Sequence, residues 1–143
     1  MGDRGNYKLV YGEKYPPIYL YSHWDGGAML SILADALNSR EGRNRWDDEA
    51  YLARIIFTHL TRNAGPELGY GIAPYLVDED RSPIIVNLVD KTVNGTSYDE
   101  FLARMGRVEP SEEPYEIPAG QRSKSEAMAD AIVEMLMKKR HDV

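Results

Sequence analysis

The chain has 143 residues, room for one domain and a tail, and its 43% hydrophobic and 28% charged residues are typical of a folded domain. Its 23 acidic and 17 basic residues give a formal net charge of −6, which argues against general duplex binding, since that affinity comes mainly from neutralising phosphates. Because cysteine is absent, disulfides, thiolate zinc sites, iron–sulfur clusters and thiol nucleophiles are excluded.

The first elements that the sequence predicts are two strands of a β-hairpin. Tyr7, Leu9 and Tyr11 alternate with Lys8 and Val10, as in a strand. Residues 18–21 form a second run of β-branched and aromatic residues. Gly12, Pro16 and Pro17 interrupt the chain between the two runs. We therefore expect an antiparallel pair joined by a loose turn.

Two amphipathic helices are expected next. Apolar residues at three- and four-residue spacing predict a helix over residues 26–38, with Asp25 as its N-cap, followed by an Arg-rich loop over residues 38–45. A stronger helix opens at residues 46–49, whose acids suit the positive end of the helix dipole, and stops at residues 63–66. Its apolar stripe, which should face the core, consists of Tyr51, Leu52, Ile55, Ile56, His59 and Leu60.

A second hairpin is predicted from residues 70–77 and 83–89, because a polar turn separates two apolar runs. Ser97 and Glu100 then form a capping box, which predicts a short helix up to Met105. This order of elements predicts an α+β fold in which one antiparallel sheet, built from two hairpins, carries a helical pair on one face.

The end of the chain has a different composition. We expect a compact domain over residues 1–106, a Pro/Glu-rich linker over 107–122 and an amphipathic helix over 123–143. The helix should serve docking or oligomerisation, so a homo-oligomer is expected, and docking within one chain or onto another copy are both open. Its apolar face includes Met128, Ile132, Met135 and Leu136.

The first candidate binding residues are aromatic and lie where the second strand meets the first helix. Tyr19, Tyr21 and His23 alternate along the strand, so all three should point to one face of the sheet, with Trp24 directly after them. Flat aromatic rings with a polar tip suit a nucleobase or another protein. The alternative is that these side chains cover the sheet beneath a helix.

The second candidate is the loop that carries Arg40, Arg43 and Arg45, with Trp46 beside it. Guanidinium groups pair with phosphate or carboxylate, and an indole ring can stack on a base or on an arginine. The alternative is a solvated loop in which Arg45 pairs with a following acid and Trp46 packs into the core.

Each of three weaker candidates has a structural explanation as an alternative to a functional one. The residues Asp25-Gly26-Gly27 could bind an anion at a helix start, although the Asp25 carboxylate would occupy the same amides as an ordinary cap. His59 lies on the apolar stripe, which indicates a buried core histidine rather than a catalytic one. No histidine pair has the spacing of metal ligands, so we assign no metal, no cofactor and no catalytic residue.

Between residues 15 and 93 the chain resembles an uncharacterised family of small accessory proteins of actinobacterial phages and prophages. The resemblance lies in YLYSHWDGG, in RWDDEAYLARIIF and in GYGI. It implies a viral or mobile-element protein in the cytoplasm of a bacterial host, and it brings no catalytic residues. The N-terminus also lacks the apolar core of a signal peptide, and no stretch approaches membrane-spanning length, so no membrane partner is expected.

The leading functional hypothesis is a binding protein without catalysis. It would sequester a small anionic, nucleotide-like ligand or inhibit a host protein, and counter-defence is one setting for either role. The alternative is a small hydrolase, or another enzyme of phosphate chemistry, that uses His23 or His59 with a nearby aspartate. Its weakness is the lack of a paired motif or a recognisable nucleophile.

Overall fold

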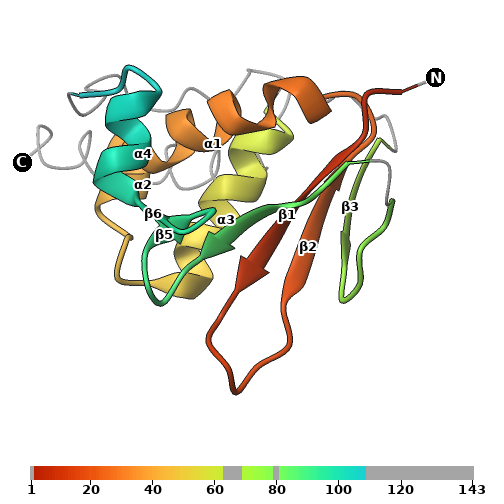
Figure 1. Ribbon diagram of the computed structural model, residues 1–143, viewed down its shortest axis with the longest axis horizontal. Helices are drawn as coiled ribbons and strands as arrows, with labels where there is room; N and C mark the ends of the chain where they lie inside the picture. The colour runs from red at the N-terminus through yellow and green to blue at the C-terminus, as the bar shows by residue number, and fades with distance from the viewer. Residues whose placement is uncertain (1, 63–68, 79–80, 109–143) are drawn as a thin grey trace, which may run out of the picture.

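In the computed structural model of the chain, the residues described are 2–62, 69–78 and 81–108. They form one sheet with helices on one of its faces (Figure 1). In chain order the elements are β1 (Gly5–Val10), β2 (Ile18–Ser22), the 3-10 turn η1 (Gly26–Ala28), α1 (Met29–Asn38), α2 (Arg40–Arg43), α3 (Glu49–Leu60), β3 (Tyr70–Ala73), β4 (Ile84–Asn87), β5 (Thr92–Val93), β6 (Thr96–Ser97) and α4 (Tyr98–Arg104).

The sheet confirms the predicted α+β class and its first hairpin, but the second hairpin is not formed. The strand order is β3-β2-β1-β4-β5-β6, and only β1 and β4 run parallel. β3 therefore pairs with β2 and β4 pairs with β1, on opposite sides of the first hairpin. The apolar residues of β4 pair with β1 in the middle of the sheet and not with β3, the strand that precedes β4 in sequence.

The connection from β3 to β4 passes over the sheet near the start of β1. The side chain of Asn6 donates a hydrogen bond to the Asp78 carbonyl oxygen at 3.4 Å, and Arg4 forms an ion pair with the Asp78 carboxylate at 2.8 Å. Asn6 stands opposite Tyr21 in the register, on the face away from the helices. This crossing explains why a polar strand residue is only 1% exposed.

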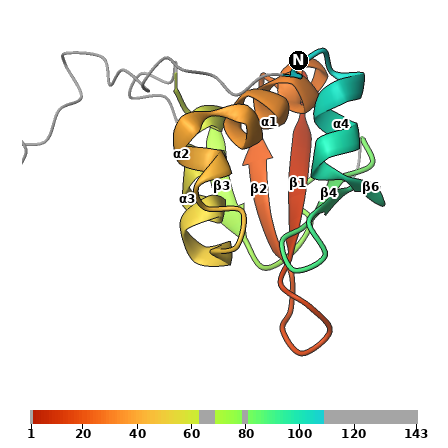
Figure 2. The same ribbon diagram turned by 90° about the vertical axis from the view of Figure 1, so that its left-hand side faces the viewer.

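The core lies between the sheet and helices α1 and α3 (Figure 2). Tyr7 and Leu9 of β1 face this layer, and the Tyr7 hydroxyl donates to the Met29 carbonyl oxygen. Burial raises the pKa of Tyr7 far above its ordinary value, so its hydroxyl stays protonated as a donor. The residues that α1 and α3 bury most completely are Met29, Leu33, Ala34, Ala36, Leu37, Leu52 and Ile56.

The stripe of α3 is narrower than predicted, because Tyr51 points outward and is 56% exposed. The helix begins at Glu49, and Asp48 caps it by accepting a hydrogen bond from the Tyr51 amide at 3.3 Å. The short helix α4 is confirmed, and Ser97 caps it through the Glu100 amide. The Glu100 side chain pairs with Arg104 instead of completing the capping box.

Two local features were missed by the sequence prediction. The expected loop over residues 38–45 contains the helical turn α2, whose start is capped by the Ser39 hydroxyl. Strands β5 and β6 are joined by Asn94 and Gly95, both at positive φ. An Asn-Gly pair is the strongest short hairpin signal, so the sequence did carry this feature.

The C-terminal predictions fall outside the described residues. These are most of the linker, the helix over residues 123–143, and the face with Met128, Ile132, Met135 and Leu136. Within the ranges that the structure describes, no helix has both the length and the apolar character needed to cross a membrane.

Candidate functional site

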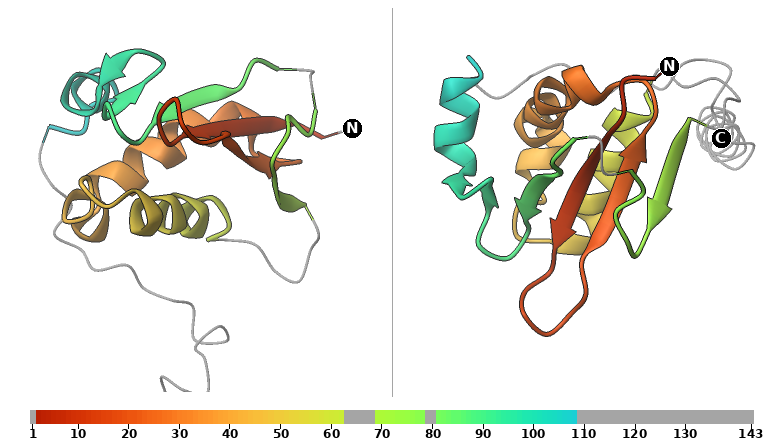
Figure 3. Two further views of the ribbon diagram at one scale, coloured as in Figure 1. Left: turned by 90° about the horizontal axis from the view of Figure 1, so that it is seen from below. Right: turned by 45° about the vertical axis from the view of Figure 1, so that its right-hand side comes forward.

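The face of the sheet opposite α1 and α3, called the open face below, carries the predicted strand aromatics. Tyr19 pairs with Lys8 and Tyr21 pairs with Asn6, so both tyrosines lie on this face, as the alternation predicted. Figure 3 shows, in its right panel, β1, β2 and β3 in front of α1 and α3. The alternative that a helix covers these tyrosines therefore finds no support among the described elements.

His23 and Trp24 extend the same aromatic group beyond the end of β2. The Tyr21 hydroxyl lies 2.9 Å from Nδ1 of His23, and the rings of His23 and Trp24 meet edge to face with centroids 4.4 Å apart. Trp24 is 53% exposed and lies over Gly69, where an added Cβ would come within 2.9 Å of the indole. Tyr21, His23 and Trp24 thus form one continuous group, and Tyr19 lies on the same face two residues before it.

Exposed apolar side chains are more numerous on the strands and their connections than on the helices, and among the strand residues Ile18 and Ile72 share the register of the core side rather than the open face. Tyr19 and Ile85 flank Lys8 in one row across the sheet, and Ile85 is 41% exposed. Among the described residues, the exposed large apolar side chains on the strands and their connections are Tyr15, Ile18, Trp24, Ile72, Tyr75, Val77, Ile85 and Val89. On the described helices and on residues 105–108 they are Leu30, Tyr51 and Val108.

The Arg-rich segment is tied to its own neighbours. Both Nε and Nη2 of Arg43 donate to the Asn38 side-chain oxygen, and its guanidinium carbon lies 5.1 Å from the Trp46 ring centroid. Arg45 lies over the Tyr51 ring at 4.6 Å and pairs with Asp48. These contacts match the structural alternative that the sequence left open for this loop.

Trp46 is partly buried and packs against the hydrophobic core. Its indole nitrogen donates to the Leu37 carbonyl oxygen at 3.0 Å, and its ring meets the buried Tyr98 ring edge to face at 5.3 Å. Arg40, in contrast, is exposed and forms no hydrogen bond or ion pair through its side chain with the described residues. Of the four predicted residues here, Arg40 alone keeps its polar side chain available.

The two predicted groups do not form one site. The aromatic group ends just before η1, whereas Arg40, Arg43 and Arg45 follow the far end of α1. Ten helical residues separate them by about 15 Å, since each residue rises about 1.5 Å. Tyr19 and Tyr21 also lie on the face of the sheet away from α1, which the Arg-rich segment follows.

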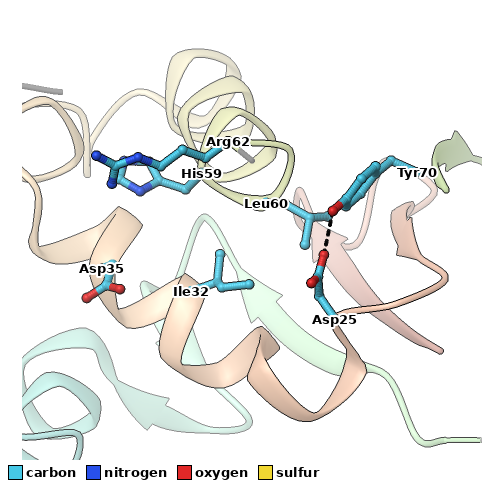
Figure 4. A pocket seen from close by; sticks show the side chains of 7 residues that line it. All are labelled: Asp25, Ile32, Asp35, His59, Leu60, Arg62 and Tyr70. Carbon is cyan, nitrogen blue, oxygen red and sulfur yellow. Dashed lines mark hydrogen bonds between the residues drawn. The ribbon is translucent and has the colours of Figure 1, made fainter. Parts of the chain in front are cut away.

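A third group lines a pocket of about 170 Å³ between α1, the end of α3 and β3. Sequence reasoning named Asp25 and His59 but missed Tyr70, whose place is set by the pairing of β3 with β2. The Asp25 carboxylate is not a helix cap, because its Oδ2 accepts hydrogen bonds from Tyr70 at 2.6 Å and Ser22 at 3.1 Å. The pocket is lined by Asp25, Ile32, Asp35, His59, Leu60, Arg62 and Tyr70 (Figure 4).

The other side of this pocket holds His59 and Arg62, near Asp35 (Figure 4). Burial lowers the pKa of His59, and the positive charge of Arg62 lowers it further, while Asp35 and Glu41 act in the opposite direction. The net shift is downward from an ordinary value of 6.5, so the imidazole is uncharged at neutral pH. His59 and Asp25 lie on different sides of the pocket, and the Asp25 carboxylate accepts its hydrogen bonds from Tyr70 and Ser22 (Figure 4).

In the described part of the chain, no group of three histidine, aspartate or glutamate side chains is placed to hold a metal ion. Comparison of the chain with models of protein families, with curated proteins and with solved structures found no match.

Proposed function

We propose that the chain is a binding protein without catalysis that acts on another protein through the open face of its sheet. The observation that carries this proposal is the row of Tyr19, Lys8 and Ile85 across the open face, with Tyr21 beside it. No described helix packs on this row. Contiguous apolar surface on a folded domain marks interaction sites, and tyrosine is enriched in them.

The chemistry of this face also specifies the partner. Lys8 stands between two apolar side chains and forms no ion pair with any described residue. If a partner covered the face, this ammonium would lose water, and an unpaired buried charge is costly. The partner should therefore offer an apolar surface with an aspartate or glutamate at its centre, which would pair with Lys8.

The resemblance to phage and prophage accessory proteins supplies the biological setting of the proposal. The partner would then be a protein of the bacterial host, met in its cytoplasm, and the effect of binding would be inhibition. Counter-defence fits this setting, since an accessory protein that blocks a host enzyme needs a surface and no active site.

Reversing the charge of Lys8 should abolish capture of this partner. A tagged chain is mixed with lysate of an actinobacterial host, and bound proteins are compared between the native chain and Lys8→Glu. We expect one host protein to be lost with Lys8→Glu, because its carboxylate would face a second carboxylate. Arg54→Glu is the matched control, since Arg54 is exposed on α3 at the helical side, and it should capture as the native chain does. Equal capture by both variants would contradict the use of this face.

The nucleotide-sequestering version of the proposal depends on Arg40, the arginine of this segment whose side chain forms no hydrogen bond or ion pair with the described residues. It requires Arg43 to leave Asn38 and Trp46, and Arg45 to leave Asp48. The protein-binding version requires no such exchange, which is why we favour it. A nucleotide that raised the melting temperature in a thermal-shift panel would support the nucleotide version instead, and its recovery in hydrolysed form would support the enzyme alternative.

We further propose that the chain forms a homo-oligomer through the C-terminal helix that the sequence predicts. Its apolar face, with Met128, Ile132, Met135 and Leu136, needs a partner surface. Truncation after Gly120 is expected to lower the mass in solution to that of a monomer. Light scattering on the full and the truncated chain checks this, and an unchanged number of copies would contradict it.

A further inference from the structure

The pocket beside Asp25 has a chemistry that the proposed function does not use. The Asp25 carboxylate is partly buried. Its Oδ2 accepts two hydrogen bonds, from the uncharged hydroxyls of Tyr70 and Ser22. Ser22 is fully buried, so this side of the carboxylate is fixed by the fold. Oδ1 accepts no hydrogen bond from the described residues, and no described lysine or arginine pairs with Asp25.

A partly buried carboxylate without a counter-ion attracts a cation. Around it, the Tyr70 ring offers an aromatic surface, and Ile32 and Leu60 offer apolar contact. An aromatic ring, a carboxylate and aliphatic walls are the groups that hold an organic ammonium ion, through cation–π attraction, a charged hydrogen bond and apolar burial. A ligand with a phosphate or a carboxylate at this side would be repelled by the negative charge of Asp25.

The far side of the pocket limits what else the ligand can carry. Arg62 brings a positive charge there, and Asp35 is already neutralised by Arg107, whose Nε and Nη2 both donate to its Oδ1. His59 is uncharged at neutral pH, so it suits a polar group without a second positive charge. A ligand with one ammonium group at the Asp25 side therefore fits better than a diamine.

The pocket is smaller than the sites that usually enclose nucleotide-sized ligands. A volume of about 170 Å³ corresponds to roughly six water molecules at their liquid share of about 30 Å³ each, and pockets for larger metabolites start near 300 Å³. We propose that this pocket binds a small primary ammonium compound, with the ammonium group on Oδ1 of Asp25 and against the ring of Tyr70.

The test uses ethylammonium and ethanolammonium as ligands of the full chain, followed by the amide resonances of Asp25, Leu60 and Tyr70. Acetate, ethylene glycol and sodium chloride at equal ionic strength are the comparison solutes. We expect saturable shifts at these amides with the two ammonium ions only. Equal shifts with sodium chloride would reduce the effect to general screening, and no saturable shift with either ammonium ion would overturn the proposal.

Variants then assign the binding to Asp25. Asp25→Asn keeps an oxygen that can accept from Tyr70 and Ser22 but removes the charge, and it should weaken ammonium binding by about tenfold or more. Asp99→Asn, the same change at an exposed position of α4, should bind as the native chain does. Tyr70→Phe keeps the ring and should retain saturable binding, which gives a second readout if Asp25→Asn does not fold. Native affinity in Asp25→Asn, or complete loss of binding in Tyr70→Phe with the fold intact, would refute the assignment.

Discussion

Gly42→Ala is expected to lower the free energy of unfolding by about 3 kcal/mol, at the upper end of the cost of forcing extra atoms into a packed interior. A Cβ at Gly42 would lie 2.0 Å from the Ala36 carbonyl oxygen and 2.9 Å from the Ser39 hydroxyl. Neither atom can retreat easily, because Ser39 Oγ donates to the Ala36 carbonyl oxygen and accepts from the Gly42 amide. The turn from α1 into α2 would have to open.

Gly71→Ala is the matched control for this prediction. Gly71 lies in β3 on the open face, and an added Cβ would meet nothing within 4 Å. The same substitution there should change stability by less than about 1 kcal/mol, with a gain expected from the stiffer unfolded chain. Urea unfolding followed by circular dichroism measures both variants. Equal losses in the two would mean that the close contact at Gly42 does not govern its cost.

Trp46→Ala is expected to lower the free energy of unfolding by about 3 kcal/mol, as for other large aromatic side chains removed from a core. It removes the edge-to-face contact with Tyr98, the hydrogen bond to the Leu37 carbonyl oxygen and the surface on which Arg43 rests. The Leu37 carbonyl oxygen would also lose its indole donor. Urea unfolding measures this loss directly.

The chain has only one other tryptophan, which supplies the control. Trp24 is 53% exposed, so Trp24→Ala should cost less than about 1 kcal/mol. If Trp46 were a stacking platform for a ligand, as one interpretation of the sequence had it, its removal would leave stability nearly unchanged. A Trp46→Ala protein as stable as Trp24→Ala would therefore favour the ligand-stacking interpretation.

Local patterns predicted the elements well and their partners poorly. Alternation at Tyr7–Tyr11 placed β1, and the capping residue Ser97 placed α4, because these signals act within a few residues. The apolar run of β4 looks the same whether it pairs with β3 or with β1. Its parallel pairing with β1 is fixed by contacts between residues more than seventy positions apart, such as Arg4 with Asp78, which no local pattern contains.

The same distinction between local patterns and distant contacts applies to the candidate sites. Alternation was sufficient to place Tyr19 and Tyr21 on one face, since the period of a strand is fixed by its geometry. Asp25 was misassigned as a cap because its actual donor, Tyr70, lies 45 residues away. The guanidinium of Arg43 could not be assigned from spacing alone, because its contact with Asn38 depends on the helical turn α2.

The most direct test of the open face is a photo-crosslink from its centre. A benzophenone amino acid is placed at position 19, or at position 51 on the outer side of α3, where Tyr51 is 56% exposed. Both chains are irradiated in lysate of an actinobacterial host and compared by mass spectrometry. The proposal predicts one host protein joined through position 19 and not through position 51. The same product from both positions, or a product from position 51 alone, would contradict it.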